Sequence, residues 1–285
     1  MKIRSVLSVL TVSLLSSCLT TLMAQKNATR NADIESIGKR DINKGTTNFS
    51  APGKDVELGR QAAAEIEKAS TIVDDSRVNS YVDGVAQNIA RNSDSQFPIS
   101  IKVIQSSGIN AFALPGGFIY VTTGALKAMD NEAELAFVVG QMVGHIAARH
   151  ATELNSRGTL LQALSIPSIV LNSSLAETAV QQGQQVAVQN AMIQFSKSAV
   201  KESDLLGLEY MYKAGYDPAA AISFLMKLQA SELAAKKQNS MFDTHPPTTD
   251  RIVLAEKIIR DLLPVRADNI LNAPEFGAIK AHLQN

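Results

Sequence analysis

The sequence predicts an α+β domain, mostly helical with one small sheet. The chain has 285 residues and is 45% apolar, which is enough to build a globular core. Only residues 97–104 and 117–121 combine alternating or continuous apolar residues with β-branched and aromatic side chains, as strands do. Much of the remaining chain carries apolar residues at helical spacing, so helices should outnumber strands.

The charge balance and the cysteine content exclude several function classes. Lysine and arginine together number 27, and so do aspartate and glutamate. No basic field remains to attract a phosphate backbone, so nucleic acid is excluded as a partner. The single cysteine rules out an internal disulfide and a cysteine-based zinc finger. Any metal site must therefore use carboxylates and the four histidines, which are His145, His150, His245 and His282.

Residues 1–25 are predicted to be a secretory signal peptide. Lys2 and Arg4 precede an uncharged stretch, residues 5–25, which has the arrangement of such a signal. The stretch is long enough to span a bilayer. However, its eight serine and threonine residues and the lack of strong stop-transfer charges favour export.

Two cleavage sites compete within this signal. Residues 15–18, Leu-Ser-Ser-Cys, look like a bacterial lipobox, in which Cys18 would be lipidated and become the mature N-terminus. Cleavage after Ala24 is the alternative, although Leu22 is large for its position. We favour the lipobox, which predicts a lipoprotein of the envelope membrane; the alternative predicts a periplasmic protein.

Residues 26–52 are predicted to be a flexible tether, followed by the folded domain over residues 53–285. The tether is rich in Asn, Thr, Lys, Gly and Asp, and its isolated apolar residues cannot offset the entropy of ordering. The domain should open with two helices over residues 56–69 and 78–89, the second capped by the Asp-Asp-Ser cluster at 74–76.

A long helix is predicted after the two strands. Asn131 is placed to cap it, and it should run to about residue 154. An apolar stripe at i, i+3, i+4, i+7 and i+11 from Leu135 indicates burial of one side. A helical hairpin is expected over residues 155–200, and further helices over 204–213, 218–232, 251–263 and 273–283.

Several short motifs occur in order between residues 55 and 262. They are Asn-Ala-Phe-Ala-Leu-Pro-Gly-Gly at 110–117, Tyr-Val at 120–121, Thr-Gly at 123–124, Glu-Ala-Glu-Leu-Ala at 132–136, Gly-His at 144–145, Ala-Arg-His at 148–150, Gly-Leu-Glu-Tyr-Met at 207–211, Ala-Gly-Tyr-Asp-Pro at 214–218 and His-Pro-Pro at 245–247. Together they closely resemble the zinc metallopeptidase family that contains HtpX and the CAAX prenyl endopeptidases. They look most similar to its exported, BepA-like branch. The resemblance implies a zincin-like metallopeptidase domain.

The same resemblance implies where the zinc site should be. In this family a His-Glu-x-x-His helix supplies two zinc ligands and the catalytic Glu, and a Glu four residues before an Asp supplies the third ligand. Here the first His position is Gln141, the catalytic Glu position is Met142, and the second His is retained as His145. The third ligand position falls on Val200, four residues before Asp204. Two of the three ligands and the general base are therefore missing.

The resemblance also implies a substrate-binding strand. Residues Asn110, Ala111, Phe112, Ala113 and Leu114 would form an edge strand that receives the substrate as an added strand.

These departures leave two possible functions, an inactive binding protein and an active peptidase with other ligands. One imidazole and a weak amide oxygen cannot hold Zn²⁺ against water, and Met142 cannot accept a proton. We therefore expect a catalytically inactive, exported homologue without zinc. It would bind unfolded or outer-membrane client proteins or a related active protease. The alternative is an active zinc metalloendopeptidase in envelope protein quality control, with His145, His245, Asp204 and Glu202 as non-standard ligands.

Other interpretations of the polar residues are weaker. His145 is expected to be a hydrogen-bonded core residue, oriented by Asp204. His150, five residues on, lies about 140° around a continuous helix and should not share a metal with His145. The pair Gly116-Gly117 precedes a strand and is too short to cradle a phosphate. A Ser-His-Asp site with His245 lacks a nucleophile elbow, and no role is expected for His282.

Overall fold

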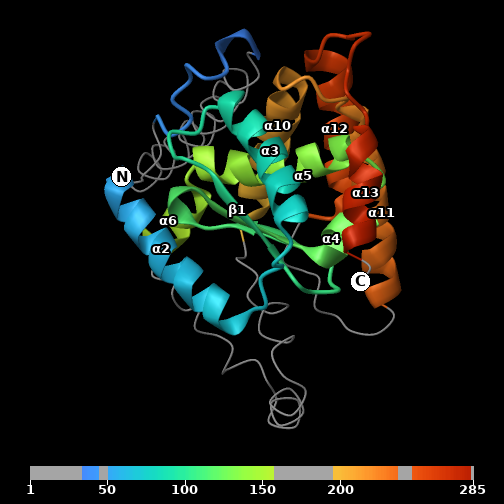
Figure 1. The fold of residues 1–285 in the computed structure, drawn as a ribbon. Coiled ribbons are helices and arrows are strands. Elements are labelled where there is room, and N and C mark those ends of the chain that lie inside the picture. Colours follow the sequence, from blue (N-terminus) through green and yellow to red (C-terminus); the bar gives the residue numbers. More distant parts are fainter. Residues whose placement is uncertain (1–33, 45–50, 157–194, 237–245, 284–285) are drawn as a thin grey trace, which may run out of the picture.

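The computed structural model describes residues 34–44, 51–156, 195–236 and 246–283. The predicted signal peptide, Cys18, His245 and most of the expected helical hairpin lie outside these residues. The helical elements of the described part are η1 (Ile34–Ser36), α2 (Pro52–Ala69), α3 (Ser76–Arg91), η2 (Pro115–Gly117), α4 (Thr123–Ala128), α5 (Glu132–Ala147), α6 (His150–Ser156), α10 (Lys197–Lys213), α11 (Ala219–Lys236), α12 (Thr248–Leu262) and α13 (Pro274–His282). Helices outnumber strands, and the predicted α+β class is confirmed (Figure 1).

A three-stranded sheet forms the centre of the domain, in the order β1-β3-β2. Its strands are β1 (Ser100–Ile104), β2 (Ala111–Ala113) and β3 (Phe118–Thr122). The middle strand, β3, runs parallel to β1 and antiparallel to β2. β2 is therefore at an edge of this sheet. Figure 1 shows α2 along one side of the sheet and α11 and α13 on the other.

The tight turn between β2 and β3 depends on glycine. Gly116 and Gly117 have φ values of 75° and 105°, a region that favours glycine over residues with a Cβ. A Cβ on Gly117 would also stand 2.0 Å from the carbonyl oxygen of Pro98. The Gly-Gly pair thus forms the turn that leads into β3, as expected from its position before a strand.

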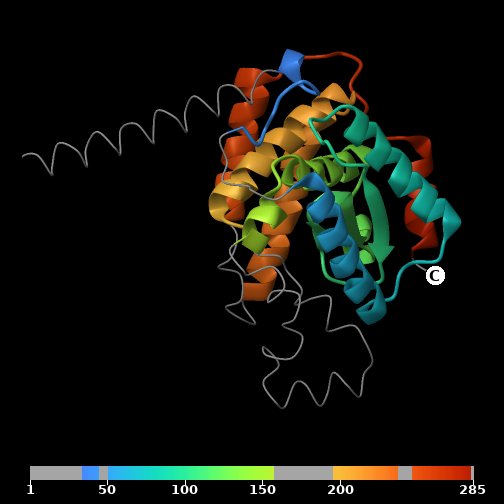
Figure 2. The same cartoon turned by 90° about the vertical axis from the view of Figure 1, so that its left-hand side faces the viewer.

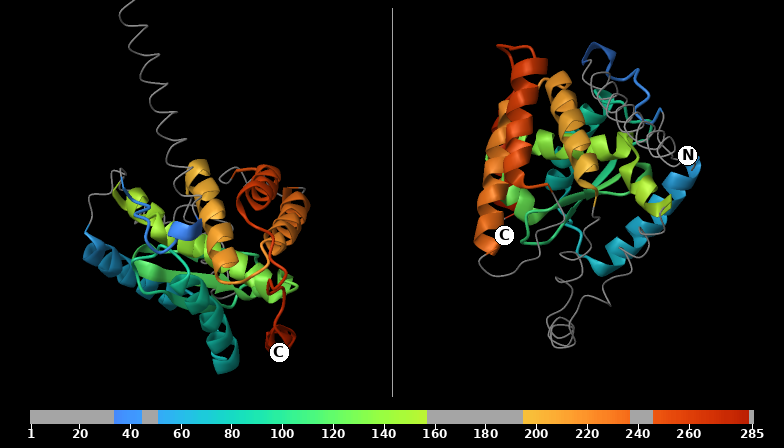
Figure 3. Two further views of the ribbon diagram at one scale, coloured as in Figure 1. Left: turned by 90° about the horizontal axis from the view of Figure 1, so that it is seen from above. Right: turned by 180° about the vertical axis from the view of Figure 1, so that it is seen from behind.

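Helix α5 is the central element of the fold. Every residue of this helix except Gln141 is buried, because α3, α10, α11 and the sheet pack around it. Figures 2 and 3 show α5 between α3 and α10. The prediction that only one side of this helix is buried is wrong. Its apolar stripe was visible, but its small residues, alanine and glycine, allow neighbours on the other sides too.

The predicted length of this helix is also wrong. Instead of continuing to about residue 154, α5 ends at Ala147 and α6 begins at His150. Arg149 lies between them with φ 53°, which breaks the helix and turns the chain. The start was predicted correctly: the side chain of Asn131 accepts a hydrogen bond from the backbone N–H of Glu134.

Glycines bring α5 and α10 into very close contact. A Cβ on Gly140 would lie 2.8 Å from the carbonyl oxygen of Gly207, and one on Gly207 would lie 2.7 Å from the backbone nitrogen of Gln141. Backbone atoms cannot move aside as a flexible side chain can. The two glycines therefore fix how closely, and in what register, α5 and α10 cross.

Residues 34–44 are folded, so the prediction of a flexible tether is wrong for this part. Ile37 and Ile42 are buried in the core. Arg40 is buried between two carboxylates, with its guanidinium 2.6 Å from Asp94 and 2.8 Å from Glu209. These long-range charge pairs order a segment whose local composition has too few apolar residues to predict it.

The described helices include none that is both long and apolar enough to cross a membrane.

Replacing Gly207 with alanine should loosen the α5–α10 contact. The added methyl group meets backbone on α5, so we expect a loss of about 1–3 kcal/mol in the free energy of unfolding. The control is Gly84→Ala in the interior of α3, where a Cβ meets nothing within 4 Å. It should stabilise the protein by up to about 1 kcal/mol. Urea unfolding followed by circular dichroism measures both, and equal stability of the two variants would contradict the assignment.

Candidate functional site

The metallopeptidase positions lie where α5 crosses α10. Gln141, Met142 and His145 are on α5, and Val200 is on α10, close to the crossing point set by Gly140 and Gly207. A Cβ on Gly144 would stand 3.1 Å from the carbonyl oxygen of Ser203, so the close approach continues along the helices. The family resemblance assigned these four positions to the zinc site, and the fold brings them close together.

Gln141 is part of a buried ion-pair network. Its side-chain amide donates a hydrogen bond of 2.9 Å to Oδ1 of Asp204. Arg251, in the first turn of α12, donates to both carboxylate oxygens of Asp204 at 2.8 Å. Burial by itself lowers the pKa of Arg251, but the charge and hydrogen bonds of Asp204 outweigh it, and the net shift is upward. Three helices, α5, α10 and α12, are joined by this network.

His145 has protein partners at both ring nitrogens. Its Nε2 is 2.9 Å from Oγ of Ser203, and its Nδ1 is 3.0 Å from Nδ1 of His150. The ring also stacks on Phe195, with 3.9 Å between the ring centroids. His145 is a buried, hydrogen-bonded core residue, as expected. Ser203 and His150 are its hydrogen-bond partners, while the hydrogen bonds of Asp204 go to Gln141 and Arg251.

The contact between His145 and His150 differs from the expectation that the two rings lie about 140° apart on one continuous helix. A continuous helix would have separated the two rings, but the break at Arg149 turns His150 back toward α5. His150 also pairs with a carboxylate, because its Nε2 lies 3.3 Å from Oε2 of Glu202. His282 pairs at the surface with Asp75, at 3.1 Å.

Ser203, His145, His150 and Glu202 form a hydrogen-bonded chain of the kind that activates nucleophiles. Ser203, however, has no exposed surface, and its single hydroxyl hydrogen goes to the carbonyl oxygen of Val200 at 2.8 Å, so that Nε2 of His145 donates to Ser203. A nucleophile must reach its substrate. We therefore interpret the chain as a structural network that holds α6 against α10.

Apolar side chains occupy the positions of the base and the third ligand. Met142 is 5% exposed and belongs to the main core, and Val200 is 1% exposed in a smaller cluster with Phe112 and Phe195. Neither can coordinate a hard divalent cation or accept a proton.

The donor set does not fit zinc. Of the family's ligands only His145 remains, and its Nε2 is held by Ser203. Among the surrogates, Asp204 is neutralised by Arg251 and Glu202 pairs with His150, while His245 lies outside the described residues. Within the described ranges no three His, Cys, Asp or Glu side chains are grouped closely enough to hold a metal ion. Zinc binding would require these pairs to be broken.

A cavity of about 420 Å³ lies beside these residues. It is bounded by β2 and the loop before it, by α5, by the start of α10, and by α11 and α12. Its apolar wall consists of Ile109, Ala111, Phe112, Ala125, Val138, Met142, Phe195, Val200, Phe224 and Leu228. Its polar wall consists of Ser106, Ser107, Gly108, Asn110, Thr122, Gln141, His145, Ser231, Glu232 and Arg251. This volume is typical of a ligand-binding pocket.

The edge strand is accessible over only part of its length. The hydrogen bonds from Thr122 N to Asn110 O and from Leu114 N to Phe118 O mark the paired positions of β2 and β3. The antiparallel alternation then directs the backbone groups of Ala111 and Ala113 away from β3. Ala111 is partly exposed and lines the large cavity, but Ala113 is 1% exposed and Leu114 is fully buried.

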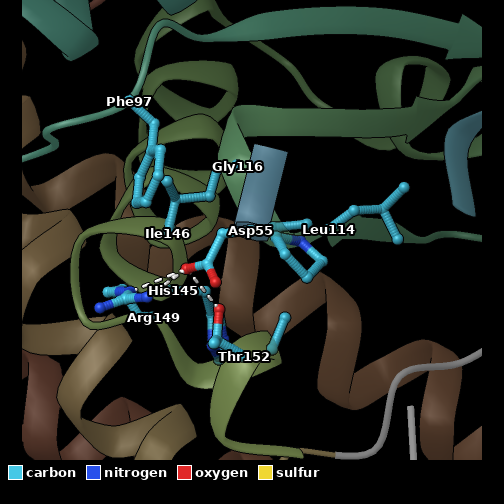
Figure 4. Close-up of a pocket in the computed structure, with 11 residues that line it drawn as sticks. Asp55, Phe97, Leu114, Gly116, His145, Ile146, Arg149 and Thr152 are labelled. Atoms are coloured by element: carbon cyan, nitrogen blue, oxygen red, sulfur yellow. Dashed lines mark hydrogen bonds and ion pairs between the residues drawn. The ribbon is translucent and has the colours of Figure 1, made fainter. Parts of the chain in front are cut away.

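The start of α6 closes the edge beyond Ala111. Ala113 and Leu114 line a second, small cavity of about 10 Å³ together with residues of α6 such as Thr152. Figure 4 shows Asp55 at this cavity, between Arg149 and Thr152. Arg149 and Thr152 both bind Oδ2 of Asp55, at 2.7–2.8 Å, which holds the left-handed turn at Arg149 in place. The added strand implied for residues Asn110–Leu114 can therefore pair only as far as Ala111.

Comparisons with known proteins show the family to which the chain belongs. Residues 74–259 match the model of peptidase family M48. The chain belongs to that family, which confirms the resemblance on which the ligand positions were assigned.

Three relatives illustrate the similarity. The beta-barrel assembly-enhancing protease of Escherichia coli (strain K12) is 24% identical over 220 residues, covering 75% of this chain and 45% of that protein. The metalloprotease LoiP of the same strain is 29% identical over 201 residues, covering 68% of this chain and 76% of LoiP. The mitochondrial metalloendopeptidase OMA1 of Schizosaccharomyces pombe is 30% identical over 176 residues, covering 60% of this chain and 50% of OMA1. The chain thus spans less than half the length of the beta-barrel assembly-enhancing protease.

Sequence reasoning missed three residues of the site. Arg251 was assigned only to a helix start, Phe195 was not singled out, and Glu232 was taken as a helix end. No local pattern connects residues 204 and 251, which meet only because α12 packs on α10.

Removing Arg251 should destabilise the protein, because the buried charge of Asp204 loses its partner. In Arg251→Met, Asp204 keeps only its bond from Gln141, and we expect a loss of about 3–5 kcal/mol in the free energy of unfolding. The double variant Asp204→Leu/Arg251→Met removes both charges and should recover most of that loss. Exposed Arg60→Met is the control and should change stability by less than about 1 kcal/mol. Urea unfolding measures all of these variants. A loss in the double variant equal to the sum of the losses in the two single variants would show that Asp204 and Arg251 are not coupled.

Proposed function

We propose that this protein is a catalytically inactive member of peptidase family M48 that binds polypeptide in the cavity beside its altered metal site. One observation carries the proposal. The two missing ligands and the missing base are replaced by residues that are built into the fold, namely Gln141, Val200 and Met142.

Hydrolysis by this family requires a polarised water and a base to deprotonate it. When bound, zinc would supply the polarisation. In this chain Gln141 instead donates a hydrogen bond to Asp204, which in turn holds Arg251. Met142 contributes an apolar floor to the cavity in place of a base. The remaining capacity of the site is to bind and orient an extended chain at Ala111.

The location and the partners are also proposed. The predicted signal over residues 1–25 supports export, with a lipid on Cys18 as the favoured anchor and soluble periplasmic protein as the alternative. Candidate partners are unfolded or outer-membrane client proteins, or a related active protease. The similarity to a beta-barrel assembly-enhancing protease supports this choice of partners.

The alternative function is a zinc metalloendopeptidase in envelope protein quality control. Membership of a peptidase family favours it. It would require His145, His245, Asp204 and Glu202 to act together, which means giving up the Asp204–Arg251 and Glu202–His150 pairs.

A casein-type cleavage assay with added zinc tests the proposal. The native protein should show no metal-dependent cleavage above that of His145→Ala, because Met142 stands at the position of the base and Gln141 and Val200 stand at two ligand positions. Metal-dependent cleavage that disappears in His145→Ala would favour the alternative instead.

The reconstructed variant Gln141→His/Met142→Glu/Val200→Glu provides the positive control. It should gain zinc binding, and zinc at about 100 times the dissociation constant should stabilise it by about 2.7 kcal/mol. Zinc should leave the melting temperature of the native protein unchanged. The double variant with Val200 retained is the matched control, since it lacks the third ligand.

A further inference from the structure

We propose that the cavity accepts an extended polypeptide segment in which a bulky apolar side chain stands next to a basic one. This inference rests on the proposed function, because it names the class of polypeptide that the same cavity would select. Three features carry it: an apolar wall, an acidic group that outnumbers its basic partner, and a free strand edge.

The apolar wall includes the residues that replace the catalytic base and the third zinc ligand. Met142 and Val200 are continuous with Phe112, Phe195 and Phe224 along the cavity. A methionine adapts its shape to different apolar partners, and aromatic rings offer large contact areas. This part of the cavity therefore fits a bulky apolar side chain, without a demand for one particular shape.

The acidic group is Glu232, on α11. Both of its carboxylate oxygens accept hydrogen bonds from the hydroxyl of Thr248, at 2.8 and 2.7 Å. Thr248 is neutral, so these bonds orient the carboxylate and leave its charge in place. Glu232 is only partly buried, and it lines the cavity.

The basic residue beside Glu232 is already committed. Among the described residues that line the cavity, Arg251 is the one lysine or arginine, and Asp204 binds its guanidinium through two hydrogen bonds. The charge of Glu232 also acts on Arg251, but Asp204, just behind the lining, already holds that guanidinium. The three groups Asp204, Arg251 and Glu232 together carry one net negative charge. A ligand with a lysine or arginine side chain complements this charge, and a ligand carboxylate is repelled.

The strand edge favours a polypeptide over a lipid. The backbone N–H and C=O of Ala111 point away from β3 and toward the cavity. Pairing with them requires a peptide backbone. A fatty acid would leave these groups unused, and Glu232 would repel its carboxylate.

Fluorescence polarisation with short labelled peptides tests the proposal on the full-length protein. The peptides share one extended, otherwise neutral frame and carry Phe-Lys, Phe-Glu or Ser-Lys at the centre. We expect the Phe-Lys peptide to bind at least about tenfold more tightly than either of the others, an effect typical of a desolvated charge contact. N-methylation of the central backbone should abolish binding. The preference for Lys over Glu should shrink as salt is raised.

Glu232→Gln is the decisive variant, because it keeps the shape and removes the charge. It should reduce the preference for Lys over Glu to less than about twofold while Phe-peptide binding persists. The control, Glu256→Gln, changes an exposed carboxylate on α12 and should leave the preference intact. Leu228→Gln, in the apolar wall, should weaken all Phe peptides.

The outcomes separate this inference from the proposed function. Equal binding of the Phe-Lys and Phe-Glu peptides overturns the inference and leaves polypeptide binding standing. A preference that survives in Glu232→Gln also overturns it, because the charge then comes from elsewhere. Binding of a fatty acid but of none of the peptides, or no binding at all, overturns both.

Discussion

The structure depends on the close crossing of α5 and α10 at Gly140 and Gly207. With backbone against backbone, neither helix can slide or turn without collision. This contact determines that Gln141 and His145 face α10. Everything at the site follows from that placement: the ion pair with Asp204, the histidine network and the wall of the cavity.

The family resemblance implies a metal bound by ligands from both helices, and so a bond across this crossing. In this chain, protein side chains make the corresponding links. Gln141 and Arg251 bind Asp204, and Ser203 binds His145. The Arg251–Asp204 and Ser203–His145 links are buried, so losing one partner would leave a polar group without compensation. The altered site is thus a stabilising part of the fold, and its apolar residues are buried too, Met142 in the main core and Val200 in the smaller cluster.

Features with local causes could be predicted from the sequence. The cap at Asn131, the strands β1 and β3 and the turn at Gly116 and Gly117 each follow from a few neighbouring residues. The candidate ligand positions were implied by the family resemblance, and Gln141, His145 and Val200 line one cavity.

Features with distant causes could not be predicted. Residues 34–44 look like a linker until Asp94 and Glu209 supply partners for Arg40. No proline or glycine at the end of α5 predicts that the helix stops there. The left-handed turn at Arg149 is held by Asp55, nearly a hundred residues earlier in the chain. That single turn places His150 against His145 and covers the edge strand beyond Ala111.

The most direct test of a metal-free, binding-only site is native mass spectrometry of the protein after incubation with equimolar zinc, purified without a chelator or a histidine tag. The account predicts the mass of the chain alone, because His145 and Asp204 are already engaged. One zinc per chain that is lost in His145→Ala would contradict it. The ligands would then have to be sought among Asp204, Glu202 and His245.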